Sequence, residues 1–76
     1  MKNKAVTIRA SFDLTKKFDI HSKQLIEHAA KFGGRDGDSG AGMGRRDMEF
    51  VFPNETSADK FMNSKFPKIP DLIVLD

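Results

Sequence analysis

Apolar and polar residues alternate over the segment Ala5–Phe12, near the start of the chain. A period of two residues with β-branched side chains predicts a half-buried strand. The two faces of such a strand differ in polarity, because successive side chains point to opposite sides. We expect an inward face of Val6, Ile8, Ala10 and Phe12, and an outward face of Thr7, Arg9 and Ser11.

Two segments have the spacing of apolar residues that is typical of helices. The first predicts a helix near Ile20–Lys31, with Asp19 as the candidate N-cap and Gly33-Gly34 as the residues that end it. The second follows the middle of the chain, and either Thr56 or Asn54 can cap it. The apolar stripe of the first helix consists of Phe18, Leu25, Ile26, Ala29, Ala30 and Phe32.

Two further strands are predicted in the second half of the chain. Arg46–Phe52 alternates again, and its outward-facing Glu49 is expected to pair with Arg9 across the strands. Leu72–Leu75 is a run of consecutive apolar residues, which predicts a buried terminal strand. The inward positions of the first of these strands are Met48, Phe50 and Phe52, and the outward ones are Asp47, Glu49 and Val51.

All six glycines of the chain lie between Gly33 and Gly44. Glycine loses the most backbone entropy on ordering, so we expect residues 33–45 to form a flexible segment. It can form either a weak edge strand with a hairpin turn or a plain loop. With the strand, the element order is βαββαβ, as in the ferredoxin-like or split-βαβ arrangement; without it, the order is βαβαβ. Both alternatives are α+β, with two helices on one face of a small sheet.

The composition indicates one small domain, residues 1–76. The chain has no cysteine, which excludes disulfides and thiolate metal ligands. No apolar run of signal-peptide length follows the charged start, and no stretch approaches the roughly 20 apolar residues that cross a bilayer. We therefore expect a protein of the cytoplasm with no membrane partner.

No motif predicts catalysis, a cofactor or a metal. The glycines of Gly40–Gly44 follow a helix and precede a strand, whereas a nucleotide-binding glycine turn follows a strand and opens a helix. The acids of Asp36–Asp47 do not reproduce the ligand pattern of a calcium loop. His21 and His28 are expected to be half-exposed and about 10 Å apart, too far to chelate one ion. Ser39 has no base partner in the sequence, so we expect a protein that is not an enzyme.

Charge along the glycine-rich segment favours a protein partner. Three arginines and three aspartates balance within residues 33–47, whereas a segment that follows phosphates should be clearly positive. The outward face of the predicted sheet also lacks the aromatic residues on which RNA bases stack. The hypothesis is a non-enzymatic protein-interaction module, such as a small regulator or inhibitor, that uses a free sheet edge and the glycine-rich loop. Its predicted contact residues are Arg35, Asp36, Asp38, Met43, Arg45 and Arg46.

Nucleic-acid binding is the alternative hypothesis. Arginine forks suit phosphate groups, and a pair of lysines before the first helix adds positive charge. Homodimerisation through the free sheet edge is a close variant of the first hypothesis. The residues expected to contact phosphates are Arg35, Arg45, Arg46, Lys16 and Lys17.

Overall fold

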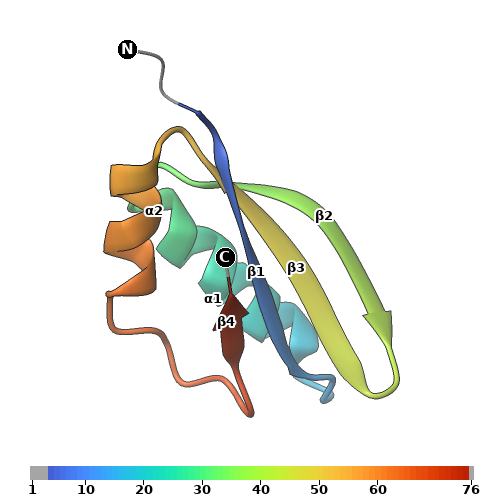
Figure 1. Ribbon diagram of the computed structural model, residues 1–76. Helices are drawn as coiled ribbons and strands as arrows, with labels where there is room; N and C mark the ends of the chain where they lie inside the picture. Colours follow the sequence, from blue (N-terminus) through green and yellow to red (C-terminus); the bar gives the residue numbers. More distant parts are fainter. Residues whose placement is uncertain (1–3, 76) are drawn as a thin grey trace.

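The computed structural model describes residues 4–75 and shows one antiparallel sheet with two helices on one face (Figure 1). Within these residues the strand order is β2-β3-β1-β4. This α+β arrangement, in the order β α β β α β, is compatible with a ferredoxin-like fold and confirms the predicted class. The three-stranded alternative is wrong, because the glycine-rich segment contributes a strand. The elements are β1 (Val6–Asp13), α1 (Phe18–Ala30), β2 (Arg35–Gly42), β3 (Arg45–Phe52), α2 (Glu55–Met62) and β4 (Ile73–Leu75).

The core lies between the helices and the two central strands. β1 and β3 pair over their full length, from Val6 opposite Phe52 to Asp13 opposite Arg45. This register aligns the inward positions of both alternating segments, as predicted. Each fully buried large apolar side chain stabilises the fold by roughly 1.5–3 kcal/mol. The largest fully buried side chains are Phe12, Phe50, Phe52, Phe61, Ile8 and Leu25.

Helix α1 begins earlier than predicted, at Phe18, and Asp19 as its N-cap is wrong. Lys17 occupies the N-cap position without a side-chain cap, while Asp19 lies in the first turn, where its charge still suits the helix dipole. Phe18 is the first residue of the helix, and its side chain packs against the core. The predicted end is confirmed: Gly33 has φ of +82°, and the N–H of the next residue donates to the Ala29 carbonyl (2.9 Å).

The N-cap of helix α2 is one of the two predicted candidates, Asn54 and Thr56. The Asn54 side-chain oxygen accepts from the backbone N–H of Ser57 (2.9 Å), so Asn54 is the N-cap. The helix ends at Met62, and the chain then returns to the sheet for β4. No helix within residues 4–75 has the length and apolar content needed to cross a membrane.

The predicted terminal strand is confirmed as β4, but the prediction that it is buried is wrong. Among the strands of residues 4–75, β4 lies at the edge of the sheet and pairs only with β1. Its central residue, Val74, packs against the core, whereas Ile73 and Leu75 are 47% and 61% exposed. A consecutive apolar run indicates burial on both faces, but the helices cover only one face of this sheet, so alternate residues of β4 face water.

Candidate functional site

Strand β2 forms the outer edge of the sheet beside β3 (Figure 1). It pairs with β3 on one side, and no strand of residues 4–75 pairs with its other side. All eight of its residues are exposed. An edge of this kind presents unpaired backbone N–H and C=O groups, which are a template for pairing with another chain. The glycine-rich segment is thus an edge strand, and its predicted flexibility stays a prediction.

A two-residue turn joins β2 to β3. Met43 and Gly44 have φ of +52° and +77°, as the central residues of a type I′ hairpin turn require. Gly42 and Arg45 flank this turn and pair with each other. The antiparallel ladder alternates, so the N–H and C=O groups of the preceding residue, Ala41, point away from β3. Met43 is fully exposed at the tip of the hairpin.

A β-bulge divides β2 into two parts. The register with β3 shifts between Asp36 and Ser39, so that Gly37 and Asp38 together stand opposite Glu49. Bulges twist an edge and interrupt regular pairing. The regular part of the free edge is therefore the uncharged stretch Ser39–Gly42.

The structure separates the six predicted contact residues into two groups. Arg35, Asp36 and Asp38 on β2, with Met43 in the turn, are exposed along the free edge and hairpin. The remaining two, Arg45 and Arg46 on β3, are half-buried and contact other parts of the protein.

Arg45 connects three segments at one corner of the sheet. Its Nε–H donates to the Ser11 hydroxyl oxygen on β1 (2.8 Å). Its terminal nitrogens donate to the Asp71 carboxylate (2.6 Å) and to the Asp71 carbonyl (2.9 Å), just before β4. The Asp13 carboxylate lies 3.5 Å from the same guanidinium. This side chain holds the corner together and is engaged within the protein.

Arg46 points to the face of the sheet that the helices cover. Its guanidinium carbon lies 5.9 Å from the centre of the Phe18 ring at the start of α1. One terminal nitrogen donates to the Ser39 hydroxyl oxygen on β2 (3.4 Å). Arg46 thus fastens β2 and α1 to β3.

The five basic residues predicted to bind phosphate do not form one patch. Lys16 and Lys17 follow Leu14, whose N–H donates to the Gly44 carbonyl (2.8 Å), so they lie near the hairpin turn. Arg35 begins β2 at the opposite end, roughly 23 Å away along the strand.

The two histidines have different surroundings. The expectation of a half-exposed His21 is wrong: it is buried, edge-on to Phe12 with 5.9 Å between the ring centres. His28 is half-buried, and the Ser64 hydroxyl beside it donates to the Phe61 carbonyl (2.6 Å). The Ser64 oxygen therefore accepts from the Nε2–H of His28 (2.8 Å). Burial, and secondly the charge of Lys31, lower the pKa of His28 below 6.5.

No group of three or more His, Cys, Asp or Glu residues in the described part of the chain could hold a metal ion.

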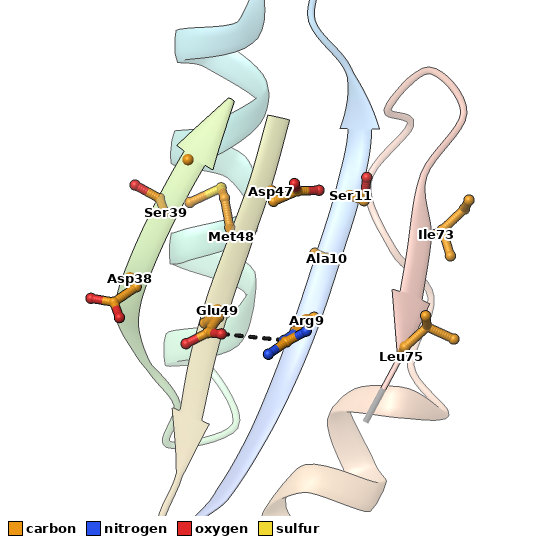
Figure 2. Close-up of a pocket in the computed structure, with 11 residues that line it drawn as sticks. Arg9, Ala10, Ser11, Asp38, Ser39, Asp47, Met48, Glu49, Ile73 and Leu75 are labelled. Atoms are coloured by element: carbon orange, nitrogen blue, oxygen red, sulfur yellow. Dashed lines mark ion pairs between the residues drawn. The ribbon is translucent and has the colours of Figure 1, made fainter. Parts of the chain in front are cut away.

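The sheet face opposite the helices contains a shallow hollow that sequence reasoning missed (Figure 2). Its volume is about 320 Å³, and it extends from β2 across β3 and β1 to β4. The alternating pattern identified the polar floor, including the expected ion pair between Arg9 and Glu49 (3.2 Å). The apolar wall is not predicted by the sequence, because a consecutive apolar run such as the one that forms β4 indicates a buried strand. Residues that line the hollow include Arg9, Asp38, Asp47, Glu49, Ile73 and Leu75.

Comparison of the chain with protein-family models, with curated proteins and with solved structures gave no match.

Proposed function

We propose that this chain is a non-enzymatic protein-interaction module, a small regulator or inhibitor, that binds an extended segment of a partner protein along the free edge of β2. One observation carries the proposal: an edge strand of eight residues is exposed along its whole length. In strand addition the backbone hydrogen bonds supply affinity, and side chains beside them supply specificity.

The composition of β2 supports pairing within its regular part. Proteins often protect edge strands with lysine, proline or inward-pointing charges. The stretch Ser39–Gly42 has none of these, and its two glycines leave the backbone accessible. Charged residues lie on the other side of the bulge, at Arg35, Asp36 and Asp38, where they can select a partner of mixed charge. Exposed Met43 offers an apolar contact at the hairpin tip.

A proline at Ala41 tests the proposal directly. Proline is tolerated in an edge strand where the N–H faces solvent, so Ala41→Pro should fold while losing one outward donor and blocking a paired strand. The matched control, Ala41→Thr, keeps the N–H group and favours strand structure. We expect the wild-type chain and Ala41→Thr to capture the same partner from extract of the source cells, and Ala41→Pro to lose about tenfold or more in affinity.

Two results would count against strand addition. One is unchanged capture by Ala41→Pro, and the other is equal capture after deletion of residues 37–44.

Nucleic-acid binding has less support, because Arg45 and Arg46 are engaged in contacts within the protein. A salt titration separates the two functions. Binding to phosphates weakens steeply as the salt concentration rises, whereas pairing of an uncharged strand depends little on salt.

A further inference from the structure

We propose that the open face of the sheet is a second binding surface, which holds a basic amphipathic helix of a partner protein in the hollow between β2 and β4. This inference goes beyond the proposed function, because the hollow lies on a face of the sheet and strand addition uses its edge. Asp38, Ser39 and Gly40 of β2 belong to both surfaces. It rests on the width of the hollow, the apolar wall along β4 and the charges toward β2.

The hollow is wide enough for a helix. Neighbouring strands lie about 4.8 Å apart, so β2 and β4 are separated by roughly 14 Å across the two central strands. A helix with its side chains is about 10–12 Å wide. The lining residues span three positions on each strand, roughly 10 Å, which matches about two turns of a helix.

One side of the hollow is apolar. Ile73 and Leu75 of β4 line it, and they are 47% and 61% exposed although the chain has a well-packed core elsewhere. Figure 2 shows the two side chains on the same side of β4, one above the other along the strand. A helix that turns its apolar stripe toward this wall would remove both side chains from water.

The other side of the hollow is acidic. Among the described residues, Asp38, Asp47 and Glu49 line it together with a single basic residue, Arg9, which pairs with Glu49. No basic side chain of residues 4–75 lies within ion-pair distance, 4.0 Å, of Asp38 or Asp47. Three carboxylates against one guanidinium make the hollow negative, although the whole chain carries a net charge of +2.

These charges select the occupant. Lysine or arginine residues on a bound helix would face Asp38 and Asp47 while its apolar residues contact β4. Nucleic acid is disfavoured at this surface, because phosphates would approach carboxylates. A second copy of this chain related by a two-fold axis would bring the same acidic residues to both sides of the interface.

The test uses a synthetic peptide of leucine and lysine, about 18 residues long, whose apolar and basic stripes align in a helix. We expect this peptide to shift the backbone amide NMR signals of Asp47, Ile73 and Leu75. The affinity of the peptide should fall as the salt concentration rises. The double variant Asp38→Asn with Asp47→Asn should bind roughly fivefold more weakly, in line with the loss of two exposed ion pairs. Leu75→Ser should also weaken binding.

Two controls separate this surface from unspecific attraction. The variant Glu27→Gln with Asp59→Asn removes the same number of charges from exposed positions on the helices, and we expect it to bind the peptide like the wild-type chain. A peptide with glutamate in place of lysine should cause no shifts.

The proposal is overturned by shifts confined to the helix side of the molecule, by equal binding of the acidic peptide, or by full affinity in the Asp38 and Asp47 double variant. A dimer in sedimentation that Leu75→Ser converts to a monomer would also overturn it, since a second copy would then cover the face. We expect the variant Ala41→Pro to bind the peptide with full affinity. Failure of strand addition and failure of this second binding surface can therefore be told apart.

Discussion

At the scale of single residues, Gly34 shows how closely the backbone between α1 and β2 approaches the core. A Cβ atom at this position would lie 2.5–2.9 Å from three ring atoms of Phe52, which is fully buried. A glycine is therefore required here by space, whereas Gly33 beside it is required by its positive φ.

Replacement of Gly34 by alanine should destabilise the fold by about 1–3 kcal/mol, because a ring in a packed core must move to admit the methyl group. Gly40→Ala is the matched control, since no atom of residues 4–75, apart from Gly40 and its two chain neighbours, lies within 4 Å of a Cβ built there. That variant should have the stability of the wild-type chain, or slightly more, because alanine reduces the entropy of the unfolded chain. Urea denaturation measures both, and equal midpoints for the two variants would refute this account of Gly34.

His28 should make stability depend on pH in a defined direction. Its folded-state pKa is lowered below 6.5, first by burial and then by Lys31, so the unfolded chain takes up the proton first as pH falls. The stabilisation is complete above about pH 6.5 and declines as pH falls from there to the lowered pKa of the folded state. Below that pKa both states are protonated and the effect levels off.

The measurement is the unfolding midpoint between about pH 7.5 and pH 5, a range in which histidine titrates. His28→Gln is the control, because glutamine can donate to Ser64 but does not titrate. The variant should lose the pH dependence over this window, and an unchanged slope would assign the effect to another group.

At the scale of elements, the patterns of β1 and β3 were sufficient to predict their faces, their core residues and the ion pair across them. Period-two alternation is a strong signal where one face is buried, as for Ile8 and Phe50. Strand β2 was predictable only as one of two alternatives, because its residues are all exposed and carry no apolar pattern. The type I′ turn forms from Met43-Gly44. Methionine at positive φ is uncommon, so the sequence does not indicate this turn type.

The exposed wall of the hollow could not be predicted from the local sequence. Whether Ile73 and Leu75 are buried depends on which face the helices cover, which is a property of the whole fold. Likewise, the internal contacts of Arg45 depend on Asp71, a residue far along the chain that the sheet brings to the same corner.

The short strand β4 should depend on Arg45. Three residues pair with β1, and the hydrogen bonds from Arg45 to Asp71 hold the segment that precedes them. Arg45→Met should release this end of the sheet and lower the stability by about 1–2 kcal/mol, because a charge-assisted pair is lost. Amide exchange should accelerate most in β4 and at Asp13, whose N–H donates to the Pro70 carbonyl.

Arg9→Met provides the comparison for Arg45. It removes an ion pair whose arginine is 76% exposed, so a change below about 0.5 kcal/mol is expected. Similar losses in the two variants, or unchanged exchange in β4 of Arg45→Met, would contradict the role of Arg45 at the corner.

At the scale of the whole molecule, the phenylalanine-rich strands and helices form a scaffold that leaves two surfaces open. The free edge of β2 offers backbone groups to an extended strand. The open face offers an acidic floor and an apolar wall to a basic helix. Both lie outside the core, so substitutions on them should change binding while leaving the free energy of unfolding within about 0.5 kcal/mol of the wild-type value.

Amide hydrogen exchange of Ala41 tests the central claim most directly, because its N–H points away from β3 while that of Gly40 in the same strand points toward it. In the free protein, we expect Ala41 to exchange much faster than Gly40. With the partner bound, Ala41 should become protected to the level of Gly40, as a new strand pairs with the edge. Unchanged exchange at Ala41 in a saturated complex would contradict strand addition at β2.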